Sequence, residues 1–439
     1  MQSTDRNLGV LHIDLRLVVS VIGFLFSCIS KITLISWMLF HLLYYLYKQD
    51  IKTAIHFLIL LQVRSLINPG IAVYITEGSS IKWICVLSIS ILVLIQSQPY
   101  LDNNVRKLQT HFIIFGIYLA LSGFLVSSYP TVVVLKTISY ILPFLAIMVG
   151  IYVTSEENWI HYINIALGLV MMGSILIFRF PVAYLRNGHS FQGMYDHPNV
   201  CGVMMAVLTA GLLYENNQRK KKIVFWVSIT LCAFMIYFSY SRTGLFSFLI
   251  VLIVGILSAK INWKNKTIII IGIAILITLL LAINETWRNN IIRFIYKGGN
   301  SINDITNSRD IQITRNLNRF QISPLFGTGL NVPYREGIRS FSFSYDLITE
   351  NGNLATALLG DMGIIGTLFF GVCYSRIYLM GKGNPFGYTV FIIPFVVSMG
   401  EMAFFSTNNF GIVLYLYFAI YLSDGLRNRK DKDEGSIYN

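Results

Sequence analysis

One arginine stands inside the longest apolar part of the sequence. Arg242 is the only charged residue between Ile223 and Ala259, and it lies in the polar run Ser239-Tyr240-Ser241-Arg242-Thr243-Gly244. Each flanking stretch is close in length to a membrane-spanning helix, so the polar run predicts a tight helical hairpin with Arg242 at its tip. An arginine at a membrane boundary is energetically costly and is therefore a candidate functional residue. The alternative is an arginine that only reaches for lipid headgroups.

A second polar group, Asp196-His197-Pro198-Asn199, precedes another apolar run. Proline suits the first turn of a helix because its missing N–H is not needed there, so we expect Asp196 or His197 to cap that helix. Capping alone does not explain a histidine and an asparagine together at this boundary, with Arg186 close in the sequence. We therefore take His197, Asn199 and Arg186 as candidate substrate-binding residues.

Lys136 is a further candidate for substrate binding. It lies about one and a half turns inside the apolar run 131 to 152. Two interpretations are equally consistent with this position: the side chain snorkels outward to the membrane surface, or it points into the same cavity as the residues above.

The longest polar stretch, residues 284–352, is rich in arginine. Its cations, all but one of them arginine, are Arg288, Arg293, Lys297, Arg309, Arg315, Arg319, Arg335 and Arg339. The planar guanidinium group binds phosphate through two parallel hydrogen bonds, which the point charge of lysine cannot do. As a set they indicate an anion site. Each one alone is equally well explained by pairing with a neighbouring acid.

The composition is that of a membrane protein. Of the 439 residues, 55% are hydrophobic and 13% are charged, whereas about 25% are charged in soluble domains. Apolar runs long enough to cross a bilayer as a helix recur along the chain. We recognise about fourteen of them, at residues 15 to 30, 33 to 47, 54 to 66, 81 to 97, 110 to 127, 131 to 152, 159 to 178, 198 to 214, 223 to 239, 243 to 259, 267 to 283, 353 to 379, 387 to 404 and 407 to 424.

The predicted fold is therefore all-α, a polytopic membrane protein with about 14 transmembrane helices. Residues 1–439 are expected to form a single transmembrane domain, in which residues 284–352 are one long extracytoplasmic loop. The run 54 to 66 contains Arg64 and is followed by Asn68-Pro69-Gly70, so it is either a crossing or a re-entrant or interfacial segment.

The basic residues indicate how the chain is oriented. A net charge of +13 is explained first by cationic cytoplasmic loops, so nucleic acid is not an expected partner. Basic clusters occur at residues 219–222, at 260–266 and after residue 426. Alternation from these clusters predicts that both termini are cytoplasmic and that four segments lie outside: residues 179–197, the turn at Ser241, residues 284–352 and the turn near Glu401.

Four motifs, in this order and spacing, resemble the O-antigen polymerase and O-antigen ligase superfamily of Wzy-like proteins. They are His197-Pro198-Asn199 at the start of a helix, Ser241-Arg242-Thr243-Gly244, the loop with Asn307-Ser308-Arg309 and Pro324-Leu325-Phe326-Gly327-Thr328-Gly329, and Asn353 with Asp361-Met362-Gly363-Ile364-Ile365-Gly366. The resemblance covers about residues 190 to 380. It implies a bacterial cytoplasmic membrane protein with a GT-C-like arrangement of helices.

The resemblance also implies roles for individual residues. Arg242 and Arg309 match the arginines that engage the diphosphate of an undecaprenyl-linked donor, with Arg315 or Arg319 as assistants. The superfamily's ligases usually carry a histidine followed by asparagine where the long loop re-enters the membrane, but here the pair is Gly352-Asn353. This departure favours a polymerase. Asn353 remains a candidate substrate-binding residue.

In the glycan transfer that the resemblance implies, the acceptor is a sugar hydroxyl, which benefits from a general base within about 3 Å. Glu350 is the first candidate and Asp310 the second. The five cysteines form no CxxC pair, and no convincing metal-binding cluster is found, so neither a metal nor a cofactor is expected. Fixed guanidinium groups would stabilise the charge of the diphosphate leaving group instead.

The predicted function is thus an O-antigen or capsular polysaccharide polymerase at the outer face of the membrane. Its expected partners are an undecaprenyl-diphosphate-linked oligosaccharide, membrane lipids and a chain-length regulator protein. An O-antigen ligase differs only in the acceptor. A flippase or transporter would also bind an anion, but such proteins more often show internal repeats.

Overall fold

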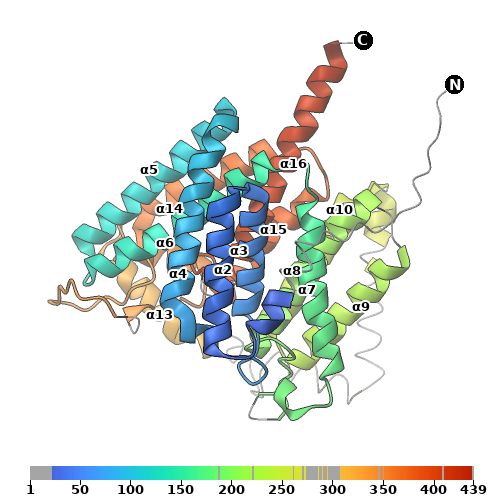
Figure 1. Ribbon diagram of the computed structural model, residues 1–439, viewed down its shortest axis with the longest axis horizontal. Coiled ribbons are helices and arrows are strands. Elements are labelled where there is room, and N and C mark those ends of the chain that lie inside the picture. Colours follow the sequence, from blue (N-terminus) through green and yellow to red (C-terminus); the bar gives the residue numbers. More distant parts are fainter. Residues whose placement is uncertain are drawn as a thin grey trace.

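The computed structural model describes residues 22–185, 188–219, 222–260, 262–268, 271–272, 285, 289, 294, 307–344, 347–349, 351–407 and 410–437. Within these residues the fold is all-α, and the only β-type pairing consists of two isolated bridges. Figure 1 shows most helices standing side by side as a bundle.

The helices of the first half are α2 (Lys31–Lys48), α3 (Ile51–Ser65), α4 (Ser79–Ser97), α5 (Asn103–Val126), α6 (Pro130–Val153), α7 (Trp159–Leu176) and α8 (Pro198–Arg219), with short 3-10 turns η1 (Ile75–Gly78), η2 (Gln98–Tyr100) and η3 (Pro181–Ala183). The second half contains α9 (Lys222–Ser239), α10 (Arg242–Ser258), α13 (Asn307–Ile322), α14 (Leu354–Gly381), α15 (Gly387–Ser398) and α16 (Gly411–Ile437).

The chain is a multi-pass membrane protein. Among the residues that the structure describes, six stretches are long and apolar enough to cross a bilayer: Ile75–Tyr100, Asn103–Val126, Pro130–Val153, Trp159–Leu176, Pro198–Asn216 and Leu354–Gly381. Three shorter helices, α9, α10 and α15, are also apolar. Helices α2 to α10 and α14 to α16 each overlap one expected run, whereas the runs 15 to 30 and 267 to 283 extend outside the described residues. The number of about fourteen crossings stays a prediction.

Side-chain burial distinguishes helices in the interior of the bundle from helices on its apolar surface. Helices α6 and α8 and the first turns of α16 are buried on nearly all sides. Helices α5 and α9 expose apolar side chains along one face, as contact with hydrocarbon requires. The interior therefore consists of helices surrounded by other helices.

Helix α3, the uncertain run 54 to 66, is a regular helix packed against α4 and α6. Its arginine is buried and hydrogen-bonded through two of its three nitrogens: Nε donates to Ser27 Oγ and Nη2 to the Ser27 carbonyl, both at 3.1 Å, and Nη2 also donates to the Val73 carbonyl. Arg64 therefore ties the end of α3 to the loops around it, as a buried charge must be hydrogen-bonded.

The loop after α3 also fixes the segment that leads into α8. Asn68 N–H donates to the Met194 carbonyl at 2.7 Å, and Asp196 N–H donates to the Leu66 carbonyl at 2.9 Å. The Asn68 side chain adds bonds to two further carbonyls, of Val182 and Gly193. These hydrogen bonds fix the position of the start of α8, where the candidate residues His197 and Asn199 lie.

Helix α13 was not expected as a helix, because residues 284–352 have no apolar run. It packs along α14, where Asn316 Nδ2 donates to Thr356 Oγ1 at 3.2 Å and Arg319 pairs with Asp361. Figure 1 shows α13 at the end of the bundle opposite the one from which the C-terminal turns of α16 project.

A kink in α14 anchors the segment that follows α13. Gly363 has φ 63° and ψ −170°, which interrupts the helix. The free carbonyls of Gly360 and Asp361 accept from Thr328 and Gly329 N–H at 3.0 Å each. In return, Ile364 and Ile365 N–H donate to the carbonyls of Pro324 and Leu325 at 2.8 and 3.2 Å.

Glycine is required at this joint. Gly327 also has positive φ, and a Cβ there would lie 2.3 Å from the Met362 nitrogen, while one on Gly363 would lie 2.5 Å from the Leu325 carbonyl. Two of the motifs that carry the family resemblance are thus two sides of one backbone contact. This contact fixes α13 relative to α14.

Candidate functional site

The predicted hairpin tip is formed by the turn between α9 and α10. Tyr240 adopts a left-handed conformation with φ 53°. Ser241 is buried and caps α10, its Oγ accepting from Gly244 N–H at 3.1 Å. Arg242 is therefore the first residue of α10. A Cβ on Gly244 would lie 2.6 Å from the Gly202 carbonyl carbon, so glycine allows α10 to approach α8 closely.

His197 is the residue that caps α8. Its carbonyl accepts from Cys201 N–H at 3.0 Å, and its Nδ1 accepts from Asn199 N–H at 3.2 Å. The side chain is otherwise exposed. Asn199, one residue into the first turn, instead reaches across the molecule, where its Nδ2 donates to Glu401 Oε1 at 2.8 Å.

Arg309 meets the same carboxylate from α13. Its Nη2 lies 2.5 Å from Glu401 Oε1, and its Nη1 donates to the Gly352 carbonyl at 2.7 Å. Both side chains of the pair are 24% exposed. Glu401 Oε1 therefore joins two candidate residues that are 110 positions apart in the sequence.

Asn353 connects this end of α14 to the turn that carries Glu401. Its Oδ1 accepts from Thr356 N–H at 3.1 Å and caps α14, while its Nδ2 donates to the Met399 carbonyl at 2.9 Å. The contacts of Asn353 are thus with the protein backbone, and they hold the Glu401 turn in place.

A cavity of about 320 Å³ lies beside the Arg309–Glu401 pair. Its lining comprises Asn199, Tyr240, Arg242, Thr243, Phe246, Ser247, Ile250, Arg309, Val396, Met399 and Gly400. Arg242 and Arg309 both border it, and they are close enough for their positive charges to repel each other. The structure therefore brings together the two arginines expected to act as a pair.

One wall of this cavity is apolar. Phe246 and Ile250 follow Arg242 at intervals of four residues on α10, so they lie on one face, about 6 and 12 Å along the helix axis. Val396 and Met399 border the cavity from α15 and the turn after it. The site thus combines a cationic end with an apolar wall.

The other two arginines of α13 lie elsewhere. Arg319 is buried, pairs with Asp361 Oδ1 at 2.6 Å, and donates to Thr328 Oγ1 at 2.6 Å and to the Gly329 carbonyl at 2.5 Å. Arg315 borders a different hollow of about 550 Å³, together with Asp310 and Tyr334. Burial and the positive charge of Arg319 lower the pKa of Arg315.

Lys136, Arg186 and Glu350 are the remaining candidates. Lys136 is buried within α6 and does not belong to the cavity lining. Arg186 and Glu350 lie outside the described residues.

Glu401 is the site residue that the sequence analysis missed. The available signal was an acid in a short turn between two apolar runs, on the face predicted to be external. No motif marked it, because its partners come from α8 and α13, far away in the sequence.

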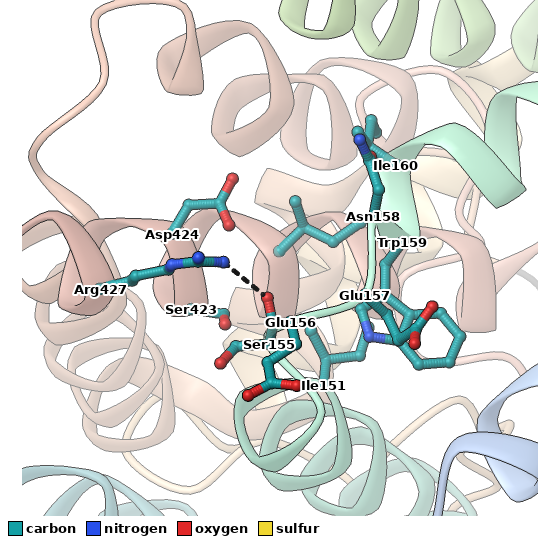
Figure 2. Close-up of a pocket in the computed structure, with 11 residues that line it drawn as sticks. Ile151, Ser155, Glu156, Glu157, Asn158, Trp159, Ile160, Ser423, Asp424 and Arg427 are labelled. Atoms are coloured by element: carbon teal, nitrogen blue, oxygen red, sulfur yellow. Dashed lines mark hydrogen bonds between the residues drawn. The ribbon is translucent and has the colours of Figure 1, made fainter. Parts of the chain in front are cut away.

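Figure 2 shows another cavity, where the turn between α6 and α7 meets α16. Its volume is about 160 Å³, and its charged lining residues are Glu156, Glu157, Asp424 and Arg427. Arg427 donates to the Ser155 carbonyl at 3.2 Å, and Glu157 pairs with Lys52. With three acids against one arginine, this lining suits a diphosphate less well than the Arg242 cavity does.

No group of three or more His, Cys, Asp or Glu side chains able to hold a metal ion occurs in the part of the chain that the structure describes.

Residues 223–371 match the family model described as O-antigen ligase (Wzy_C). The matched region runs from α9 through the Arg242 turn and α13 into α14, and it confirms the resemblance for this part of the chain. No curated protein matches the sequence. The protein therefore carries an O-antigen ligase family domain and is a membrane protein of polysaccharide biosynthesis.

Proposed function

We propose that the protein is a polysaccharide polymerase that works at the outer face of the bacterial cytoplasmic membrane. In this reaction, a glycan carried on undecaprenyl diphosphate is transferred to the non-reducing end of another lipid-linked repeat unit. Each transfer lengthens the glycan chain by one unit.

The cavity between α10 and α15 is the observation that carries the proposal. Two guanidinium groups, of Arg242 and Arg309, border its polar end, and Phe246 and Ile250 continue from this end as an apolar wall. A prenyl-linked diphosphate has the same division, an anionic head on an apolar tail. Arginine suits the head because its planar fork binds phosphate oxygens in pairs, and burial of apolar surface favours the tail.

The same arginines support the chemical step. The diphosphate gains negative charge as its bond to the anomeric carbon breaks, and fixed cations in a water-poor site stabilise this charge more than water does. Arg309 is held in place by the Gly352 carbonyl and by Glu401. Little reorganisation is then needed in the transition state.

Ligation of the same donor glycan to a lipid A core is the second candidate function. The description of the matching family favours it. The donor site would be identical, and only the acceptor would differ. The presence of Gly352, where the ligases that the sequence resembles carry histidine, supports the polymerase.

The glycan pattern of a strain that lacks the protein tests these alternatives. A polymerase predicts lipid A core capped with single repeat units. Unmodified core together with long lipid-linked chains would favour the ligase, and repeat units retained inside the cell would contradict both and indicate a flippase.

The proposed site must face outward, with both termini cytoplasmic. In a cysteine-free background, His189→Cys and Asp310→Cys should react with a membrane-impermeant thiol reagent in intact spheroplasts, whereas Lys221→Cys and Lys430→Cys should react only after permeabilisation. This follows from the retention of basic loops in the cytoplasm. The opposite labelling pattern would contradict the proposed function.

A further inference from the structure

We propose that Glu401 is the general base of the transfer reaction: Arg309 and Asn199 hold its Oε1, and its Oε2 accepts the proton of the acceptor hydroxyl. This inference rests on the proposed function and adds the residue that activates the acceptor.

The two carboxylate oxygens of Glu401 have different contacts. Oε1 takes both hydrogen bonds, from Arg309 Nη2 at 2.5 Å and from Asn199 Nδ2 at 2.8 Å. Oε2 accepts no hydrogen bond from the residues that the structure describes. The side chain is about a quarter exposed. The carboxylate is thus fixed through one oxygen, while the other remains available to a ligand.

Arg309 places this carboxylate next to the proposed leaving group. The guanidinium has five N–H donors, and two of its nitrogens are used by Gly352 and Glu401. Arg309 also borders the cavity, so a diphosphate bound there would lie on the same guanidinium as Glu401. The neighbouring residues Met399 and Gly400 line the cavity as well.

Other described carboxylates near α13 are less suited to the role. Asp361 is buried and fully engaged, because Arg319, Asn351 and the Asn331 N–H all bind it. Asp310 borders the separate hollow beside Arg315 and Tyr334. Glu401 alone among these three contacts a residue that lines the Arg242 cavity.

The proposed step balances as follows. The acceptor oxygen forms a bond to the anomeric carbon of the donor, and its proton passes to Glu401 Oε2. The bond between the anomeric carbon and the diphosphate oxygen breaks, and its electron pair leaves with undecaprenyl diphosphate, whose charge Arg242 and Arg309 stabilise. No oxidant, reductant or further reactant is needed.

The test is Glu401→Gln in the purified full-length protein in liposomes, with a lipid-linked repeat unit as substrate. Glutamine keeps an oxygen for Arg309 and Asn199 but cannot accept the proton. We expect kcat to fall by about 100-fold or more, with KM within about 3-fold of the wild-type value. A large rise in KM with unchanged kcat would overturn the inference, because Glu401 would then only hold Arg309.

Two further variants complete the experiment. Glu401→Ala should be equally slow, and added formate should restore part of its rate while leaving the wild type unchanged; no effect of formate would overturn the inference. The matched control is Glu77→Gln, because Glu77 pairs with Lys31 at an exposed site away from the cavity. It should keep the wild-type rate.

The outcome also separates this inference from the proposed function. Extension of the repeat unit by the wild type, together with an equally active Glu401→Gln, would overturn the base assignment alone. Absence of extension by the wild type would overturn both.

Discussion

The two ends of α13 each carry an arginine paired with an acid, and the two pairs differ in their exposure to solvent. Arg309 lies 2.5 Å from Glu401 and Arg319 lies 2.6 Å from Asp361. The side chains of the first pair are 24% and 24% exposed, and those of the second pair are 3% and 0% exposed. The two distances differ by only 0.1 Å, whereas the solvent exposure of the two pairs differs greatly.

This difference in solvent exposure indicates different roles for Arg309 and Arg319. A sealed pair cannot exchange partners without leaving a buried charge uncompensated, which is costly. Arg319 moreover binds Thr328 and Gly329 in the segment that joins α13 to the kink of α14. An open pair beside a cavity can share its guanidinium with an anion. We therefore propose that Arg319 fixes the position of α13 and that Arg309 binds the substrate.

The largest effect is expected from breaking the sealed pair. Arg319→Met should destabilise the protein by about 3 to 5 kcal/mol, because it leaves the Asp361 carboxylate buried without its cation. Thermal unfolding in detergent would show this as a lower midpoint. Arg319→Met combined with Asp361→Asn should recover part of the loss, since both charges are then removed.

The matched control for this prediction is Lys31→Met. Its pair with Glu77 at 3.4 Å is 58% and 52% exposed, and exposed pairs contribute little to stability. An Arg319→Met variant as stable as Lys31→Met would show that access does not distinguish the pairs.

The open pair should instead control activity. Arg309→Lys and Arg242→Lys should each keep the charge and fold normally, but lose about 100-fold or more in rate, because fixed paired donors to the diphosphate are lost. The double variant should lose less than the product of the single losses, since residues that act as a unit are not additive. Extension assays in liposomes measure the rates of the two single variants and of the double variant. Near wild-type amounts of polymer from either lysine variant would show that the arginine only anchors the helix at the membrane surface.

A smaller effect is expected at the apolar wall. Phe246→Ala should raise KM for a long-chain prenyl donor by about 3- to 10-fold, because it removes apolar contact area worth about 1 kcal/mol. A donor with a short prenyl chain should be less affected. The control is Leu257→Ala, on the same helix but outside the cavity lining. Equal effects of the two variants on KM would contradict a role for Phe246 in binding the prenyl chain.

Removal of divalent metal should have no effect. The guanidinium groups of the open pair and of Arg242 are proposed to stabilise the charge that magnesium stabilises in other enzymes. A chelator should therefore leave the ladder of extended products unchanged. Loss of the ladder, restored by added magnesium or manganese, would show that the arginines do not act alone.

Much of this architecture follows from the sequence by itself. Length and hydropathy determine where helices form, because a backbone in hydrocarbon must satisfy its own hydrogen bonds. The hairpin tip at Arg242 and the capped start of α8 were predictable for the same reason, since each depends on residues within a few positions. The arginine-rich stretch predicted an anion site, which stays a prediction, and the family resemblance singled out Arg309.

The tertiary structure decided which of these residues meet. Arg309 and Glu401 are 92 positions apart, and Asn199 and Glu401 are 202 apart, so no local pattern encodes their contact. The same holds for α13, which is positioned by the exchange of backbone hydrogen bonds at the Gly363 kink. Whether an arginine is sealed like Arg319 or open like Arg309 depends on what packs over it, and packing brings together segments that the sequence keeps apart.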